Sequence, residues 1–264
     1  MNPLRIGVVT PDPGHQLLAD TARLLRAAGH RVDWLHPRDP APADTCDAYL
    51  LKARTPEALA LGRELEARGA PVVNSTAATE RCRDRVALAD TARRAGLPYA
   101  PTLAVTTPAR LAAEPWTGRP LVLKSRWSRR GDLVARADTP DALRDLARRW
   151  PDEPVVVQEF VPNDGWDRKL WSVAGHPFGA LRRSELTPDG KGPNLPLTPL
   201  PPAWTALLHA VGTAFALDVH GVDLVVPEDG PPLIVDINAF PGARDQPGAP
   251  EALAKLAATR ARGA

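Results

Sequence analysis

Short apolar stretches alternate with segments of helical periodicity through the first part of the chain. In residues 15–28, leucines and alanines recur every three or four positions, as on one face of a helix. Strands that alternate with helices are typical of a parallel sheet covered by helices. We therefore expect an α/β unit at residues 1–97. Its strands are expected at 4–9, 31–35, 48–51 and 70–74, and its helices at 15–28, 55–68, 75–82 and 84–95.

Beyond residue 98 the same pattern predicts more strands and fewer helices. The turn Pro-Glu-Asp-Gly-Pro-Pro at 227–232 joins two apolar runs and predicts a hairpin. We expect two further units, at residues 98–160 and 161–264, which add α+β character to the α/β fold. Strands are expected at 121–124, 155–161, 169–174, 178–183, 221–226 and 233–238, and helices at 139–150, 203–215 and from 251 onward.

Two carboxylates and an amide stand inside the strands of that hairpin. Asp223 lies in HGVDLVV, and Asp236 and Asn238 lie in LIVDINAFPG. Residues two apart in a strand project from the same face, so Asp236 and Asn238 should lie together and close to Asp223. Oxygen ligands of this kind suit Mg²⁺. The alternative is an Asp236 that faces solvent on an edge strand, although a carboxylate among apolar neighbours is costly to bury unpaired.

Other polar residues end or interrupt apolar strands. Lys124 ends LVLK and precedes the basic loop SRWSRRGD, where it suits a phosphate site; a lysine that only marks the strand boundary is the alternative. Gln158 and Glu159 in VVVQEFV suit an adenine site, or a half-buried strand with a polar stripe. Of Arg182 and Arg183, only one should point toward the site, because successive residues of a strand alternate faces.

Composition narrows the classes of function. A net charge of +2 over 264 residues gives no global field for nucleic acid or anionic lipid. Two cysteines, Cys46 and Cys82, are too few for a disulfide framework or a metal knuckle. No apolar run approaches the length of a membrane span, and the chain begins directly with a strand rather than a signal peptide. We expect a cytoplasmic protein without nucleic-acid or membrane partners.

The order of these motifs resembles that of the ATP-grasp enzymes. The chain contains, as far as Gly242 and in this order, Asn74-Ser75, RCRDR, AGLPYAPT, LVLK, VVVQEFV, HGVDLVV and VDINAFPG. Two branches look similar, the RimK-like carboxylate–amine ligases and the inositol trisphosphate 5/6-kinases. The resemblance implies an ATP-grasp fold with a preATP-grasp domain at 1–97 and two ATP-grasp subdomains, at 98–160 and 161–264, that bind Mg-ATP between them.

The resemblance also implies roles for individual residues. Lys124 and Lys169 would bind the phosphates of ATP, and Lys169 and Arg182 would be the catalytic pair, with Arg182 stabilising charge at the transferred phosphoryl group. Mg²⁺, with Mn²⁺ as the alternative, would be held by Asp223, Asp236 and Asn238. The implied nucleotide-binding residues are Arg85, Lys124, Ser128, Arg130, Gln158, Glu159, Phe160, Val161, Asp167 and Lys169.

Three positions depart from the family pattern. Arg85 stands in RCRDR where a lysine that reaches the nucleotide is common, and arginine supplies the charge with a different geometry. The loop SRWSRRGD has no run of glycines, so Ser128, Arg129 and Arg130 would replace backbone donors. Asp236 stands where the ligase branch usually has a glutamate, which is one methylene longer. The first two departures leave weak or altered nucleotide use open.

Three functions stay open at this point. A carboxylate–amine ligase that acts through an acyl phosphate is preferred, because the chain is short and lacks a broad basic surface that would suit a polyphosphorylated ring. It would take a small-molecule or peptide acceptor and an amine. A nucleotide-binding protein without turnover is another alternative. Monomer and homo-oligomer are both compatible with the family. The main alternative to the ligase is a small-molecule kinase, which is favoured if several arginines converge, namely Arg126, Arg129, Arg130, Arg182 and Arg183.

Overall fold

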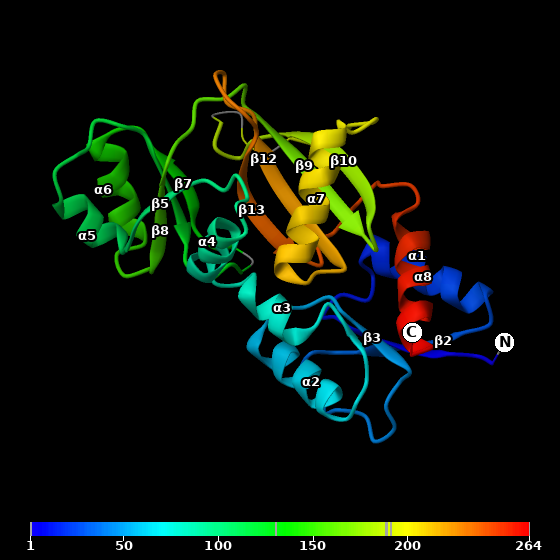
Figure 1. Cartoon of the computed structure of the whole chain (residues 1–264). Helices are drawn as coiled ribbons and strands as arrows, with labels where there is room; N and C mark the ends of the chain where they lie inside the picture. The colour runs from blue at the N-terminus through cyan, green and yellow to red at the C-terminus, as the bar shows by residue number, and fades with distance from the viewer. Residues whose placement is uncertain (1, 130, 188–189, 191, 264) are drawn as a thin grey trace.

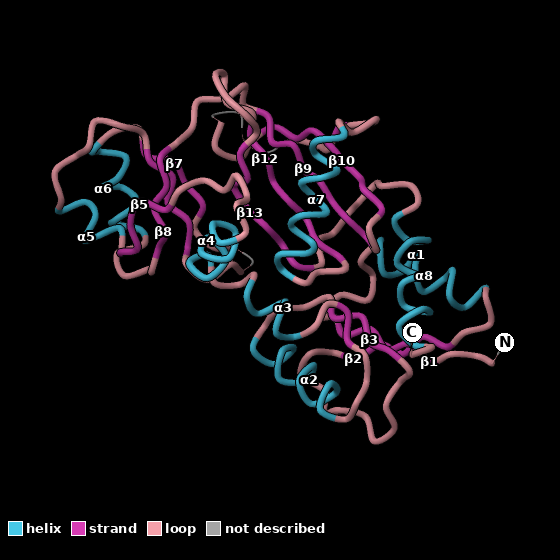
Figure 2. Tube along the Cα trace, in the orientation of Figure 1, coloured by secondary structure: helices cyan, strands magenta, loops and turns pink. Residues whose placement is uncertain are grey.

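The computed structural model describes residues 2–129, 131–187, 190 and 192–263, and these residues form three separate sheets (Figure 1). The N-terminal sheet is blue in Figure 1, the central sheet is green, and the C-terminal sheet runs from yellow-green to orange. Figure 2 shows that each sheet has helices beside it. Among the described helices, none combines the length and the apolar composition that a membrane span requires.

The first unit is a four-stranded parallel sheet with helices on both faces. Its elements are β1 (Arg5–Val9), α1 (Gln16–Ala27), β2 (Arg31–Leu35), β3 (Ala48–Leu51), α2 (Pro56–Ala67) and β4 (Val72–Val73). The helices α3 (Thr76–Arg81) and α4 (Arg85–Arg94) follow, and their buried apolar residues belong to the core of the C-terminal sheet. The strand order is β2-β1-β3-β4. Ile6 and Val8 of β1 pack with α1, whereas Val9 packs with α2, because side chains alternate along a strand. Thr55 caps the N-terminus of α2, because its hydroxyl accepts a hydrogen bond from the Ala58 N–H at 3.3 Å.

The second unit is an antiparallel sheet with two helices on one face. Its elements are β5 (Thr102–Thr106), α5 (Pro108–Ala113), β6 (Leu121–Ser125), β7 (Val134–Ala137), α6 (Pro140–Arg149) and β8 (Val155–Glu159). The strand order is β5-β8-β6-β7. Leu121 and Leu123 of β6 pack with Leu143 of α6 in a small core. Val122 and Lys124 alternate with these leucines and therefore face away from the helices.

The third unit is an antiparallel sheet that carries one long helix on one face. Its elements are β9 (Trp166–Val173), β10 (His176–Arg183), β11 (Leu195–Pro196), α7 (Pro202–Phe215), β12 (Val219–Val225), β13 (Leu233–Ala239) and α8 (Ala249–Ala261). The strand order is β11-β10-β9-β12-β13. Leu170, Val222 and Ile237 share a core cluster with Phe215 of α7. On the opposite face, Val173 and Val219 pack in a second core with Leu253 of α8, and polar residues such as Lys169 and Asp223 follow farther along the same strands.

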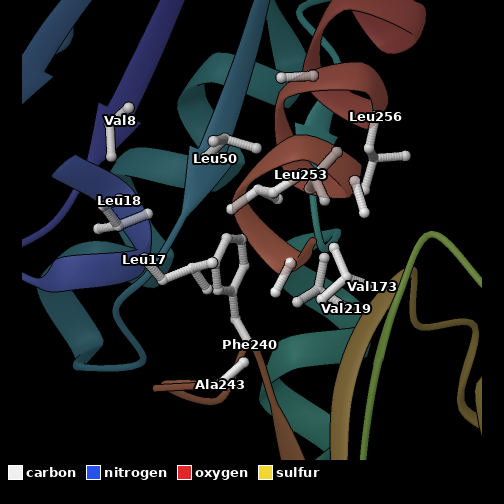
Figure 3. Packing of buried hydrophobic residues seen from close by; sticks show 14 of the residues in the cluster. Val8, Leu17, Leu18, Leu50, Val173, Val219, Phe240, Ala243, Leu253 and Leu256 are labelled. Carbon is white, nitrogen blue, oxygen red and sulfur yellow. The ribbon is translucent and has the colours of Figure 1, made fainter. Parts of the chain in front are cut away.

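One core joins the first unit to the third. Leu253 of α8 belongs to the same cluster as Leu17 of α1 and Val219 of β12. Figure 3 shows Phe240, which follows β13, lying between Leu17 and Val219 in this cluster. Because this apolar core is continuous, the two units are packed as one body.

The chain enters and leaves the central unit beside the same hairpin, and the unit also contacts the start of α4 through a β-bridge between Asp84 and Trp127. On entry, Tyr99 forms a β-bridge with Ile234, and on exit Asn163 forms one with Pro227. The Ala100 N–H also donates a hydrogen bond to the Ile234 carbonyl at 2.8 Å. Both crossings of the chain therefore lie against the β12–β13 hairpin.

The α/β fold class predicted from the sequence is confirmed, and the predicted hairpin is present between β12 and β13. Four elements were missed, β5, α5, β7 and β11. The strand expected at 70–74 was too long, since β4 contains only Val72 and Val73. The strand expected at 155–161 ends at Glu159.

Candidate functional site

The polar face of the C-terminal sheet holds a row of charged side chains. Asp223 of β12 pairs in register with Asp236 of β13 on one side and with Lys169 of β9 on the other. All three lie opposite α7, because their sequence neighbours Leu170 and Val222 pack with that helix. The hairpin and its neighbouring strand thus place two carboxylates and one ammonium group side by side.

Asn238 extends this row. Its Nδ2 donates a hydrogen bond to Asp236 Oδ2 at 3.1 Å, so the two side chains lie together as predicted. Its Oδ1 accepts a hydrogen bond from Arg54 at 3.0 Å, although the two residues are 184 positions apart in sequence. Gly221 lies opposite Asn238 in register, and a Cβ there would come within 3.1 Å of Pro241. A side chain at Gly221 would therefore crowd the loop that follows β13.

The two carboxylates of the row have different electrostatic surroundings. Burial raises the pKa of Asp223, and the charge of Asp236 adds to this, although the ion pair with Lys169 opposes it. Burial also acts to raise the pKa of Asp236. There, however, Arg85 and Lys124, together with Lys169, outweigh it and hold the pKa below its usual value. Asp236 is therefore ionised while surrounded by cations.

Lys124 reaches from the central sheet to the C-terminal sheet. Its ammonium group donates a hydrogen bond to the Val235 carbonyl at 2.7 Å. The register of β12 and β13 shifts between Asp223 and Leu224, and the resulting bulge takes Val235 out of the strand pairing. Burial lowers the pKa of Lys124 to about 8, although Asp236 favours its charged form. A lysine that only marks a strand boundary would not be buried in this way.

Arg85 connects the basic loop to the same row. Its guanidinium donates to the Ser125 carbonyl and to Asp132, both at 2.7 Å, and its other terminal nitrogen lies 3.8 Å from Asp236. One planar guanidinium can engage three groups because it carries five N–H donors in a fixed geometry. Arginine at this position thus ties the loop after β6 to β13.

A cleft of about 500 Å³ lies between the polar faces of the central and C-terminal sheets, and we call it the first cleft. Arg182 does not line it, and Arg130 lies outside the described residues. The predicted residues that do line it are Arg85, Lys124, Ser128, Gln158, Glu159, Phe160, Val161, Asp167, Lys169, Asp223, Asp236 and Asn238. The structure therefore brings together nearly all of the residues predicted for the nucleotide and the metal.

The end of β8 forms one wall of the first cleft. Gln158 is buried, and its Nε2 donates a hydrogen bond to the Ala100 carbonyl at 3.0 Å. Glu159 points to the surface, where it pairs with Arg119 at 3.1 Å. The guanidinium of Arg136 lies 3.6 Å from the centroid of the Phe160 ring. The side chain of Glu159 is thus already engaged outside the cleft, whereas Gln158 and Phe160 shape its wall.

The arginines that would favour a kinase do not form one site. Arg182 faces a cleft and Arg183 does not, as expected for neighbours in a strand. Each of the four described ones has its own partner: Arg126 with Asp84 at 2.7 Å, Arg129 with Glu153 at 2.8 Å, Arg182 with Asp167 at 3.9 Å, and Arg183 over Trp166 at 4.6 Å from the ring centroid. The convergence that the kinase reading requires is therefore absent among these four.

A second cleft, of about 830 Å³, adjoins the first one and was not predicted. It lies between the end of β3, the start of α1 and the polar face of the C-terminal sheet. Lys52 and Arg54 directly follow the apolar strand β3, and ligands of parallel sheets bind at such carboxyl ends, so this signal was present in the sequence. Its basic residues are His15, Lys52, Arg54, Lys169, Arg182 and Arg244, and the two clefts share Arg54, Lys169, Asp223 and Asn238.

Comparison with known proteins supports this picture. No model of a protein family matches the chain. A probable alpha-L-glutamate ligase from Parasynechococcus marenigrum (strain WH8102) is 27% identical over 273 residues, which cover 91% of this chain and 58% of that protein. Another, from Picosynechococcus sp. (strain ATCC 27264 / PCC 7002 / PR-6), is 31% identical over 196 residues, which cover 69% and 64%. The chain thus spans less than two thirds of the length of the curated relatives it matches.

The fold has a counterpart among solved structures. The crystal structure of a RimK domain ATP-grasp protein from Sphaerobacter thermophilus DSM 20745 matches with a TM-score of 0.75 and 23% identity, over 96% of this chain and 99% of that one. The chain therefore has the ATP-grasp fold that its motifs implied. Within that fold, its sequence resembles the RimK-like ligases, and the names of the two curated relatives agree with this branch.

Proposed function

We propose that the chain is an ATP-dependent carboxylate–amine ligase that works through an acyl phosphate. The observation that carries the proposal is the row of Lys169, Asp223 and Asp236 across three strands, which faces Lys124 over the first cleft. The similarity to two proteins named as alpha-L-glutamate ligases supports the same reaction class. The division into domains at 1–97, 98–160 and 161–264 is part of the proposal.

ATP would lie in the first cleft. Its adenine would sit against Gln158 and Phe160, where the backbone after β8 can read the edge of the base. Its phosphates would meet Lys124 and Lys169, with Arg85 and Ser128 beside them and Glu159, Val161 and Asp167 along the wall. Because Glu159 is held at the surface by Arg119, we assign its part in binding to the backbone rather than to the carboxylate.

The residues of the row fit a hard divalent cation. Asp223, Asp236 and Asn238 offer two carboxylates and one amide oxygen from adjacent strands, the ligand type that Mg²⁺ and Mn²⁺ prefer. No group of three His, Cys, Asp or Glu residues that could hold a metal occurs in the described part of the chain, so phosphate oxygens and water would complete the set. When bound, Mg²⁺ would neutralise charge on the phosphates.

The chain's own residues would serve the two steps of the reaction. A carboxylate oxygen of the acceptor attacks the γ-phosphorus, and the bond to the β–γ bridging oxygen breaks as ADP leaves. The amine then attacks the acyl carbon and phosphate leaves. Lys169 would stabilise the charge of the transferred phosphoryl group. Arg182, which lines the second cleft, would approach the same phosphoryl group from the side of the acceptor. Positioning and charge stabilisation would supply most of the catalysis, and no side-chain nucleophile is needed.

The proposal extends to the partners. The acceptor would be a small acid or the carboxylate of a peptide, and the second cleft is the space available to it. A homo-oligomer is compatible with the proposal, as is a monomer. A net charge of +2 gives no global field for nucleic acid or anionic lipid, so we expect no such partner. The cytoplasmic location stays a prediction.

Release of ADP tests the proposal. Mg-ATP is offered with pools of small carboxylic acids and amino acids, singly and together, and active pools are examined by mass spectrometry. A ligase releases ADP only with both substrates, and its product is lighter than their sum by one water. Release with one acceptor and a product that has gained a phosphoryl group would replace the proposal by a kinase. Binding of ATP without any release would indicate a protein without turnover.

A further inference from the structure

The second cleft is open beside the row and carries an excess of positive charge. Its lining includes five cationic side chains, namely Lys52, Arg54, Lys169, Arg182 and Arg244, but only two carboxylates, Asp223 and Asp245. One of those carboxylates, Asp223, is already paired with Lys169. The lining therefore carries an excess of about three positive charges, which Asp167 just outside it reduces through its contact with Arg182, and such a concavity attracts anions.

Lys52 and Arg244 carry much of this imbalance. Neither forms an ion pair with a carboxylate in the part of the chain that the structure describes. The ammonium of Lys52 lies 5.9 Å from the centroid of the Phe240 ring. Burial first, and then the charges of Arg54 and Arg244, together lower the pKa of Lys52 to about 8, against an opposing effect of Asp12. The dominant charged neighbours of Lys52 are thus other cations, which is an unfavourable arrangement unless an anion joins them.

The loop after β13 offers further donors to the same space. Phe240, Ala243 and Asp245 have φ angles of 47°, 38° and 57°, which residues other than glycine rarely adopt. Turns of this kind can direct successive N–H groups into one concavity. The N–H groups of Gly242, Ala243 and Arg244 donate to no backbone carbonyl of the described residues.

His15 lines the cleft next to this loop. Its Nε2 lies 3.3 Å from the position that a Cβ on Gly242 would take, so the ring packs against the loop. Its Nδ1 is buried and has no hydrogen-bond partner among the described residues. A buried polar atom without a partner costs free energy, and a ligand oxygen would satisfy it.

We propose that the second cleft holds a substrate carboxylate that is not the one activated, with Lys52 and Arg244 as its counter-charges and with His15 and the loop N–H groups as further donors. The inference rests on the proposed ligase function and narrows its substrates. At least one of them is an acidic molecule with a free carboxylate besides its reacting group. That carboxylate belongs either to a dicarboxylic acceptor or to an amino acid that supplies the amine, and both sources present the same chemistry to the cleft.

A binding experiment tests the charge preference directly. The wild-type chain, loaded with Mg²⁺ and a non-hydrolysable ATP analogue, is titrated by calorimetry with glutarate and its monoamide, and with L-glutamate and its α-amide. We expect at least one acid to bind about tenfold more tightly than its matching amide, because a charge-assisted contact is lost in the amide. The pair that shows the preference identifies the source of the carboxylate.

Variants place that preference in the cleft. Lys52→Met keeps the length of the side chain, and Arg244→Met changes an exposed residue that is not required for the core. Both should reduce the preference for the acid to about twofold or less, whereas Lys255→Met on the exposed face of α8 should keep it. If Lys52 only supported the loop through Phe240, the affinities for the acid and the amide would fall equally in Lys52→Met. The preference for the acid would then remain, which would overturn the proposal. Equal binding of acid and amide by the wild type would also overturn it.

The same variants separate this inference from the proposed function. ADP release that needs an acid and an amine, but is indifferent to Lys52→Met and Arg244→Met with every pair, would leave the ligase standing and remove the carboxylate site. A preference for the acid that is lost in both variants, in a chain that releases no ADP with any pair, would support the carboxylate site and contradict the ligase.

Discussion

The first and second clefts share a wall but balance their charges differently. In the first cleft, Lys169 is paired with Asp223, and Arg85 with Asp132. In the second cleft, Lys52 and Arg244 have no ion pair among the described residues. A cleft that balances its own charge suits a ligand that arrives with a counter-ion, as Mg-ATP does. A cleft with excess positive charge suits a ligand that arrives as a bare anion. The comparison therefore agrees with the proposal that the nucleotide binds in the first cleft and the substrate in the second.

The largest expected effect comes from Asp236→Asn, which upsets the balance of the first cleft. The amide keeps the shape of the side chain but removes a carboxylate that faces Arg85 and Lys124. With an acid and an amine present, ADP release at saturating ATP should fall by about 100-fold or more, because a metal ligand and its charge are both lost. Asp229→Asn, in the exposed turn before β13, is the matched control and should keep full activity. Unchanged ADP release in Asp236→Asn would mean that the row does not bind the metal.

Lys124→Met tests whether the first cleft binds phosphate. The variant keeps an unbranched side chain but removes the buried ammonium group. The KM for ATP should rise by about 10- to 100-fold, since a hydrogen-bonded charge contributes roughly 1.5–3 kcal/mol. The KM for the acid and the amine should change much less, and Lys255→Met serves as the exposed control. An equal rise in the KM for all substrates would show that the two clefts are not separate.

Lys52→Met tests the unbalanced charge through stability and its dependence on pH. The pKa of Lys52 is lowered from an ordinary value of 10.5 to about 8, first by burial. Between those values the unfolded chain binds the proton and the folded one does not, so stability rises as the pH rises through this window. The variant should therefore be more stable than the wild type below pH 8, by about 1–3 kcal/mol, and the difference should shrink toward pH 10.5.

Urea unfolding of both proteins across this pH range measures that effect. Lys255→Met should show no such trend, because its side chain is exposed. A constant difference between Lys52→Met and the wild type at every pH would indicate a change of packing rather than of charge.

The smallest effect is expected from Glu159→Gln. The carboxylate of Glu159 pairs with Arg119 at the surface, and exposed pairs of this kind contribute only about 0–1 kcal/mol. The free energy of unfolding should change by no more than about 1 kcal/mol, and the KM for ATP should stay within about twofold of the wild-type value. Arg119→Gln removes the other partner and should behave alike. A large rise in the KM for ATP in Glu159→Gln alone would return this carboxylate to the nucleotide site.

The sequence was most informative where a strand carries charge on one face only. Asp223 and Asp236 were placed correctly beside each other because the side-chain period of a strand and a short turn determine their register. The alternation also explains why these carboxylates sit among apolar residues, since Val222 and Ile237 face α7 and the carboxylates face the cleft. Local periodicity therefore suffices for residues that belong to one hairpin.

Contacts between distant units could not be predicted in the same way. Arg54 meets Asn238 across 184 positions, and Lys124 meets Val235 across 111 positions, and no local pattern encodes either contact. The strand β5 was missed because its Leu103 and Val105 are exposed rather than part of a core. The cations of the second cleft come from the segment after β3, from β9 and β10, and from the loop after β13, which only the folded chain brings together.

The attachment of the central unit has a consequence for how such a protein can change. The chain enters the central unit beside Ile234 and leaves it beside Pro227, so the central unit is an insertion whose two ends lie against the same hairpin. A segment from another ATP-grasp protein, cut at the equivalent crossings, could be exchanged without opening the core that joins α8 to the N-terminal sheet. The wall that the central sheet gives to the first cleft can then change by recombination as well as by point mutation, while the row on the C-terminal sheet and the second cleft are kept.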